Sequence, residues 1–206
     1  MTWTIVGLGN PGEEYDNTRH NAGRMALEVA AKKAGGDEWK VNPVKASAHG
    51  AGKGAKATVA KATIGKTTAV FVLPDTFMNK SGAAVLKYVK SAKAAERMIV
   101  VYDDLDLPIG TIKLSFNRGS GGHKGVESIM RALKTKKFTR VRIGVSRATA
   151  SGKIKKPSGE DEVIDFILAA FKPAEMTELK GVFKKVSEAI ETIVTEGPER
   201  AMNQFN

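Results

Sequence analysis

Four polar side chains of complementary chemistry follow the strand-like segments of this sequence: a histidine, a carboxylate and two amides. Asn10 and His20 lie in the loop after the first apolar run, Asn79 lies after a later one, and Asp103 follows the intensely apolar run that begins at Met98. A neutral imidazole that a carboxylate orients, with amides beside it, suits the transfer of a proton from water to a leaving oxygen. The four residues therefore predict a hydrolytic site.

Each of these residues also has a structural interpretation. His20 could satisfy hydrogen bonds of its own loop, Asp103 could cap a strand end, and Asn10 could hold the turn before Pro11. Their joint position favours a site, because ligands of open α/β sheets bind outside the carboxyl ends of the strands, where all of these loops are expected.

The elements that hold these loops follow from apolar periodicity and breaker residues. Strands are expected near 3–8, within 56–63 and 67–73, and at 98–102, 111–116, 139–146 and 163–167; helices are expected near 22–34, 80–92, 124–134 and 174–196, with a short one after Gly197 and Pro198. The alternation predicts an α/β fold: a single domain over residues 1–206 with a mixed, mostly parallel central sheet and helices on both faces. The polar stretch from Thr149 to Asp161 is expected to form a mobile flap, and Pro43 to Lys66 a poorly specified hairpin.

The charge of the chain is concentrated in one segment. Between Lys113 and Lys156 there are thirteen lysines and arginines against the single acid Glu127, a surplus that accounts for the whole net charge of +11. A block of one sign is the electrostatic pattern expected of a polyanion partner, and it favours nucleic acid over a merely solvated basic surface.

Several classes of function are disfavoured by the sequence. The stretch from Gly7 to Gly12 fits G-x-G-x-x-G, but no helix opens there until about Ala22, so a dinucleotide-binding turn is not favoured. Gly65-Lys66-Thr67 resembles the end of a phosphate-binding loop, but Ala60 stands where the first glycine is needed.

The sequence does not favour a metal site or a membrane-spanning segment. The chain has no cysteine, and His20, His49 and His123 have no close partner at zinc-ligand spacing, so no metal is expected. No apolar run is long enough to span a membrane and no secretion signal is evident, and a cytoplasmic location is expected.

The motifs taken together are similar to those of a known family. From Thr4 to Phe205 the chain resembles the bacterial-type peptidyl-tRNA hydrolases, in motifs that occur in the same order: Gly7 to Gly12, Thr18 to Gly23, Pro74 to Gly82, Asp103 to Pro108 and Gly121 to Gly125. The resemblance implies a monomeric esterase without metal or cofactor that cleaves the ester between a peptide and the 3′ end of tRNA, with peptidyl-tRNA as its partner. A non-catalytic RNA-binding relative of the same fold is the alternative.

The resemblance also implies roles for individual residues. His20 is expected to be the general base and Asp103 to orient it; Asn10 is expected to contact the peptide beside the ester, and Asn79 to position water or the developing oxyanion. The expected cleft-lining and substrate-binding residues are Tyr15, Asn21, Phe77, Met78, Gly121, His123, Lys124 and Arg142.

Two positions depart from the family pattern. Arg142 matches a clamp for tRNA phosphate, but Ser115 stands where the clamp lysine is expected, so Lys113 or Arg118 is a candidate replacement. Lys124 stands where relatives carry asparagine. At a helix entrance its ammonium needs a nearby anion, for which terminal tRNA phosphates are the hypothesis and solvent exposure the alternative. The turn from Gly119 to Gly122 is either a phosphate-binding nest or simply a tight turn.

Overall fold

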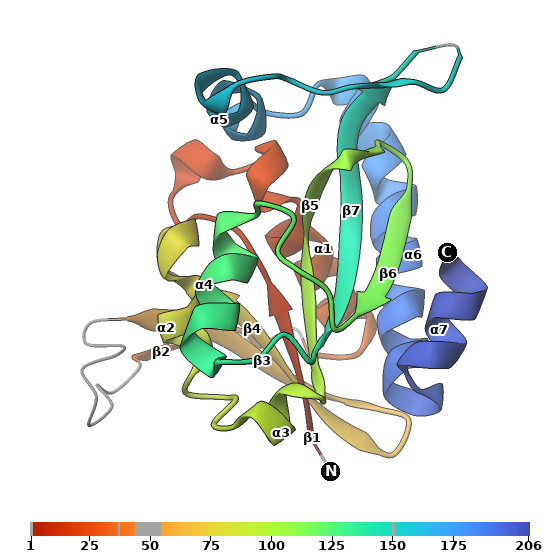
Figure 1. The fold of residues 1–206 in the computed structure, drawn as a ribbon. Helices are drawn as coiled ribbons and strands as arrows, with labels where there is room; N and C mark the ends of the chain where they lie inside the picture. The colour runs from red at the N-terminus through yellow and green to blue at the C-terminus, as the bar shows by residue number, and fades with distance from the viewer. Residues whose placement is uncertain (1, 37, 44–54, 150) are drawn as a thin grey trace.

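A mixed sheet forms the centre of the molecule in the computed structural model, which describes residues 2–36, 38–43, 55–149 and 151–206. The strand order is β2-β3-β4-β1-β5-β7-β6, with β8 paired to β7 (Figure 1). The four central strands run parallel, and the others are antiparallel to their neighbours. The strands are β1 (Thr2–Gly7), β2 (Lys40–Pro43), β3 (Lys56–Ile64), β4 (Thr67–Pro74), β5 (Met98–Pro108), β6 (Ile112–Phe116), β7 (Thr139–Ala148) and β8 (Ile154–Lys155).

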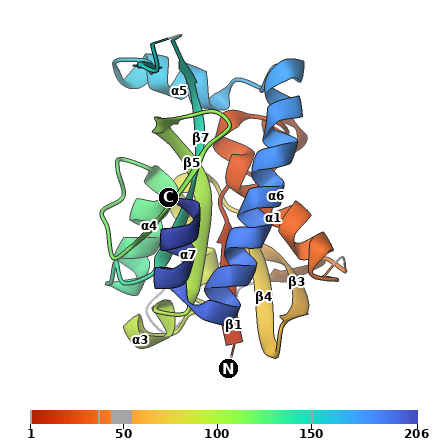
Figure 2. The same cartoon turned by 90° about the vertical axis from the view of Figure 1, so that its right-hand side faces the viewer.

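Helices cover both faces of this sheet, as Figure 2 shows with α1 and α6 on one side and α3 and α4 on the other. Successive residues of a strand point to opposite faces, so Ile5 joins one core cluster with α1, α6 and α7, and Val6 joins the other with α2, α3 and α4. The helices are α1 (Ala22–Lys33), α2 (Ser81–Val85), α3 (Ala92–Ala95), α4 (Lys124–Leu133), α5 (Glu160–Leu168), α6 (Pro173–Glu196) and α7 (Pro198–Phe205); the 3-10 turns are η1 (Glu13–Tyr15), η2 (Arg19–Asn21) and η3 (Met78–Lys80). The predicted fold class is confirmed.

Three predicted elements were wrong. The expected strand 163–167 is part of helix α5: Gly159 precedes it, acidic residues fill its first turn, and the half-buried side chains Val163, Phe166 and Ile167 recur at helical spacing. The expected helix 80–92 is divided, because Ser91 accepts a hydrogen bond from Ala94 N and starts α3 anew.

The third error concerns the end of β5. The sequence predicts a loop from Asp103, but β5 continues to Pro108, with a register shift against β7 after Asp104. The short strand β2 has no counterpart among the predicted elements. His49 and residues 44–54 of the expected hairpin lie outside the described residues, and most of the remainder forms β3.

Close packing of α1 on β5 sets the geometry of the carboxyl edge. Arg24 N donates to Leu8 O over 2.9 Å, and Leu8 N donates to Val101 O over 3.0 Å. A Cβ on Gly23 would lie 2.2 Å from the Val101 carbonyl oxygen, so only glycine allows this approach. The turn η2, directly before α1, is thereby held beside the end of β5.

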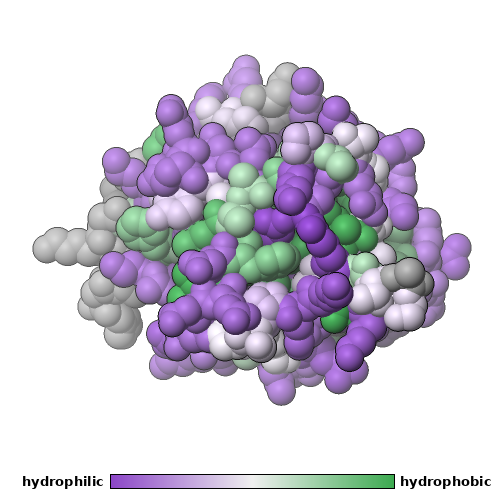
Figure 3. Space-filling model, turned by 90° about the horizontal axis from the view of Figure 1, so that it is seen from above, coloured by the Kyte–Doolittle hydropathy of each residue, from purple (hydrophilic) through white to green (hydrophobic). Residues whose placement is uncertain are grey.

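Helix α5 lies at the top of Figure 1, above the strand ends, and none of its residues is buried. Seen from this side, apolar surface gathers in the middle of the face and hydrophilic residues border it (Figure 3). The described residues contain no helix long and apolar enough to cross a membrane.

Candidate active site

His20 and Asp103 meet at the carboxyl edge of the sheet. His20 comes from η2 and Asp103 from β5, and the imidazole Nδ1 lies 3.1 Å and 3.0 Å from the two carboxylate oxygens of Asp103. Both residues are buried, at 6% and 4% exposure. Because an ionised carboxylate only accepts, His20 carries its proton on Nδ1, and its Nε2 keeps the lone pair of a base.

A second histidine uses the same carboxylate. His123 Nε2 lies 3.0 Å from Asp103 Oδ1, and its Nδ1 accepts a hydrogen bond from Val126 N at the start of α4. The Nδ1 acceptor role requires the proton on Nε2, so His123 donates to Asp103. The two imidazole rings lie 4.9 Å apart, and Tyr102 packs edge-on against His123 at 4.8 Å.

The environment sets the ionisation of this cluster. Burial disfavours the imidazolium of His20, but the charge of Asp103 and its hydrogen bond more than offset this, so the pKa of His20 is raised above 6.5. Burial would also raise the pKa of Asp103, yet the two histidines hold it well below its ordinary value. Asp103 is therefore a carboxylate throughout the neutral range, and burial raises the pKa of Tyr102 to about 12, which keeps the phenol neutral.

Asn10 is fixed by three hydrogen bonds. Its backbone N–H donates to Asn21 Oδ1 over 2.8 Å, and its backbone carbonyl accepts from Asn21 Nδ2 over 3.0 Å. Its side-chain Oδ1 accepts from Met78 N over 2.8 Å, which assigns the amide orientation. In the described part of the chain no hydrogen bond engages Asn10 Nδ2, so Asn10 keeps one amide donor for a ligand.

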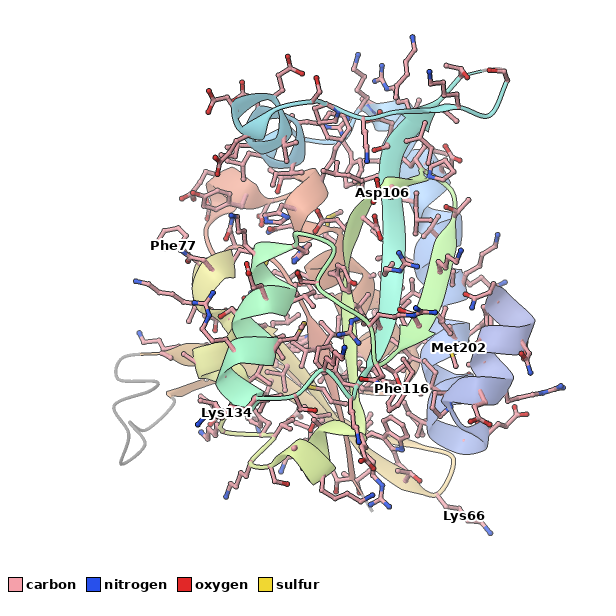
Figure 4. The ribbon with its side chains drawn as sticks, in the orientation of Figure 1. Lys66, Phe77, Asp106, Phe116, Lys134 and Met202 are labelled. Atoms are coloured by element: carbon pink, nitrogen blue, oxygen red, sulfur yellow. The ribbon has the colours of Figure 1, made fainter. Side chains whose placement is uncertain are left out.

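The other cleft residues differ in exposure. Met78 is 5% exposed and Asn21 1% exposed, with both polar side-chain atoms of Asn21 committed to the Asn10 backbone. Phe77, at the edge of the molecule in Figure 4, is 56% exposed, and its ring lies edge-on to that of Tyr15 at 6.4 Å. Asn79 is exposed on η3, next to the buried Met78. Asn21 thus supports the loop, while Tyr15, Phe77 and Asn79 are accessible; substrate contact by each of them stays a prediction.

The loop before α4 is a tight turn, in which His123 N donates to Ser120 O over 3.2 Å and Gly122 N donates to Ser120 Oγ over 3.3 Å. Gly121 and Gly122 have φ of +61° and +82°, and a Cβ on either would meet nothing within 4 Å. His123 already caps the helix through Val126 N, and Lys124 is the exposed first residue of α4. Ten residues further on, Lys134 ends this helix about 15 Å from Lys124, so basic residues occupy both of its ends (Figure 4).

The basic strands β6 and β7 place Lys113 directly opposite Arg142, and Ser115 opposite Arg140. Directly paired residues point to the same face of a sheet, so Lys113 and Arg142 are neighbours, and Lys113 is exposed. Arg142 NH1 donates to Asp104 Oδ2 over 2.9 Å, whereas the guanidinium of Arg140 is buried and donates to the carbonyls of Lys136, Phe138 and Arg118.

The histidine–aspartate cluster also has donor atoms of the kinds that bind metal. Among the described residues, His20, Asp103 and His123 bring their ligand atoms within 4.8 Å of one another. Both nitrogens lie at hydrogen-bond distance from the carboxylate, and His123 Nδ1 is occupied by Val126 N, so hydrogen bonding accounts for the whole arrangement.

Sequence reasoning named His123 only as a substrate-binding residue and missed its bond to Asp103. The two are 20 positions apart, and no spacing rule links a strand end to a helix N-cap. The sequence held only a weak indication of this role. A histidine directly before an apolar helix can cap it by accepting a hydrogen bond on one ring nitrogen, which fixes the proton on the other.

Comparisons with known proteins agree with one another. The family model for peptidyl-tRNA hydrolase matches residues 4–206. The peptidyl-tRNA hydrolase of Aquifex aeolicus (strain VF5) is 38% identical over 203 residues, covering 98% of this chain and 95% of the relative. That of Carboxydothermus hydrogenoformans is 39% identical over 203 residues, covering 98% and 97%. The crystal structure of the Acinetobacter baumannii peptidyl-tRNA hydrolase superposes with a TM-score of 0.79 at 29% identity, covering 100% of this chain and 94% of that one.

Proposed function

This chain belongs to the peptidyl-tRNA hydrolase family, and from that premise we propose that His20, oriented by Asp103, is the general base that hydrolyses the ester between a peptide and the 3′ end of tRNA. The enzyme is a hydrolase. The observation that carries the residue assignment is the buried pair itself, in which Nδ1 faces a carboxylate and Nε2 is the basic nitrogen.

The reaction then proceeds by proton transfer through one nitrogen. Nε2 of His20 takes a proton from water as the water oxygen attacks the ester carbonyl. Asp103 stabilises the imidazolium that forms without itself taking a proton. When the tetrahedral intermediate collapses, the imidazolium returns the proton to the ribose oxygen that leaves, and the products are the free peptide acid and tRNA.

Asn10 supplies a reason for selecting peptidyl over aminoacyl substrates. Its Oδ1 is used by Met78 N, so only the Nδ2 donor is available to the substrate. An N-blocked substrate offers a carbonyl acceptor there, whereas a free α-ammonium offers only donors, which leaves both groups unpaired. Asn79, exposed on η3, is proposed to position the attacking water or the oxyanion.

The basic segment of the chain is the proposed tRNA contact. Ser115 stands where the clamp lysine is expected. Lys113 is a better replacement for that lysine than Arg118, because Lys113 is paired with Arg142 in register and lies on the same face of the sheet. Two cations on one face can contact a single phosphate together. The enzyme is proposed to act as a cytoplasmic monomer without cofactor or metal.

The deciding experiment measures free tRNA released from N-acetylaminoacyl-tRNA by the purified protein, with EDTA present. The matched control is the same tRNA carrying the same amino acid with a free amino group. Rapid release from the first and slow release from the second supports the assignment. Binding of tRNA without release supports the non-catalytic RNA-binding alternative instead, and a requirement for added metal contradicts the metal-free mechanism.

A further inference from the structure

Arg19, the residue directly before His20, is a buried arginine whose two terminal nitrogens both bind one segment of the chain. It is 4% exposed. Its NH1 donates to the carbonyls of Ala169 and Ala170 over 3.1 Å each, and its NH2 donates to Glu175 Oε2 over 2.8 Å. The Arg19 side chain thus connects η2, the turn that holds His20, to the start of α6.

Glu175 is the centre of this contact. One carboxylate oxygen accepts from Arg19 and from Lys172 N, and the other accepts from Arg147 Nε and NH2 at 3.1 Å and 3.0 Å. Burial alone would raise the pKa of Glu175, but Lys172 N–H and the two arginines lower it overall, so the carboxylate is ionised at neutral pH. Glu175 therefore joins three separate elements: η2, the end of β7 and the start of α6.

Backbone contacts place the same two segments together. Arg19 N donates to Ala169 O over 3.2 Å, Phe171 N donates to Asn17 O over 2.9 Å, and Thr18 bridges to Ala170. The Arg19 guanidinium also lies 4.5 Å from the ring centre of Phe166 on α5 and 5.2 Å from that of Phe171. The chain before His20 is consequently packed on the connection between α5 and α6.

His20 is thus flanked by two anchors of different kinds. On the C-terminal side of His20, Asn21 binds the Asn10 backbone, which fixes η2 to the loop after β1. On the N-terminal side of His20, Arg19 forms an ion pair with Glu175. A turn of three residues has little freedom of its own when both neighbours of the central residue are fixed, so the imidazole is directed at Asp103.

We propose that Glu175 is a positioning residue of the reaction, which holds Arg19 and thereby keeps His20 at hydrogen-bond distance from Asp103. The inference rests on the proposed role of His20 as general base. It assigns to a carboxylate 155 positions away in sequence, with no contact to the reacting atoms, a share of the catalytic geometry.

The test compares Glu175→Gln with Glu178→Gln, which removes the same charge from an exposed position one turn along α6. Glutamine has the size of glutamate, so both variants are expected to fold. We expect Glu175→Gln to lower kcat about tenfold to a hundredfold, because displacing a catalytic group by about 1 Å has effects of that order. KM should change by less than about twofold, and Glu178→Gln should match the wild type.

The pH dependence separates positioning from general stability. A looser His20–Asp103 bond lowers the pKa of His20 toward 6.5, so the acidic limb of the kcat profile should move to lower pH in Glu175→Gln. Combining Glu175→Gln with Arg19→Gln should cost little more than either alone, because the two side chains act as one unit. A lower melting temperature with unchanged kcat and pH limb would leave Glu175 a purely structural residue and overturn the proposal.

The outcome is distinguishable from a failure of the proposed function. The pKa of His20 can be followed by NMR titration of its ring protons in wild type and Glu175→Gln, without any substrate. If the wild type fails to release tRNA but the His20 pKa falls in Glu175→Gln, the positioning contact stands and the reaction assignment fails. An identical His20 pKa in both proteins rejects the positioning contact, whatever the enzyme hydrolyses.

Discussion

At the level of single residues, the proposed proton chemistry depends on one carboxylate that accepts from two histidines. Asp103 receives Nδ1–H from His20 and Nε2–H from His123, and each donor has its tautomer fixed by a different neighbour. Among the described residues His20 Nε2 has no hydrogen bond, and Asp103 stays ionised; the proposed general-base hydrolysis needs both conditions.

Replacing the base should stop the chemistry and spare the binding. We expect His20→Ala to reduce kcat for release of tRNA by at least about a hundredfold, the low end of what a positioned general base contributes. The dissociation constant for tRNA, measured by filter binding, should be nearly unchanged, because the imidazole is buried and presents little surface to a ligand. Activity within a few-fold of wild type would remove His20 from the mechanism.

Replacing the orienting carboxylate should alter the pH profile. In the proposed mechanism the neutral imidazole of His20 is the base, and Asp103 raises its pKa above 6.5, so the wild type should lose activity as the pH falls through that raised pKa. In Asp103→Asn only the effect of burial on His20 remains, so the pKa of His20 falls and the acidic limb of the pH–rate profile moves to lower pH. The rate should drop by up to about ten-thousandfold, because asparagine can stabilise the wrong tautomer. A pH–rate profile with an unmoved acidic limb would contradict the pairing.

At the level of elements, the contact of α1 with β5 decides whether the base meets its partner. Gly23→Ala places a methyl group against the Val101 carbonyl, and we expect it to lower the free energy of unfolding by about 1–3 kcal/mol and to lower kcat as η2 shifts. Urea unfolding and tRNA release measure the two effects. Gly181→Ala is the control: it lies inside α6 with nothing within 4 Å, and it should stabilise by about 0.5–1 kcal/mol. Equal stability of the two variants would refute this account.

The start of α4 has no structural need for a lysine, because His123 caps the helix. We therefore expect Lys124→Asn to preserve turnover and to reduce the slope of log affinity against log salt by about 0.7, the contribution of one phosphate contact on a single strand. Lys66→Asn, in the turn between β3 and β4 at the bottom of Figure 4, should leave the slope unchanged. Coincident slopes for wild type and Lys124→Asn, with a sharp fall in turnover, would place Lys124 in the chemistry instead.

At the level of the whole molecule, the basic segment passes the site at Lys124, directly after His123, and extends along α4 to Lys134, so we propose that it holds a long polyanion beside the ester. We expect kcat/KM for full-length N-acetylaminoacyl-tRNA to fall steeply between about 50 and 200 mM salt, because each phosphate contact adds to the salt slope. An N-acetylaminoacyl ester of a short CCA oligonucleotide should show a much shallower fall. Parallel slopes for the two substrates would mean that the basic segment does not contact tRNA.

The sequence was enough to place Asn10, His20 and Asn79 directly after the correct strands, whereas Asp103, expected in a loop, lies within β5. Strands such as Met98 to Val101 are apolar throughout and alternate with amphipathic helices, a pattern that predicts an α/β sheet with its ligand crevice at the carboxyl edge. The sequence was not enough to predict helix α5. Its run from Val163 to Leu168 is as compatible with a strand as with a helix, and the position of this segment above the strand ends decides between the two.

By itself, then, the sequence determined the fold class, the family motifs and the chemistry available to His20, Asp103, Asn10 and Asn79, because these depend on local periodicity and residue type. Only the tertiary structure decided which nitrogen of His20 is basic, that His123 shares Asp103, and that Arg19 is held by Glu175. Hydrogen bonds between residues 20 to 156 positions apart arise from the packing of α1, α4 and α6 on one sheet, and no local pattern encodes a contact that exists only when separate elements meet.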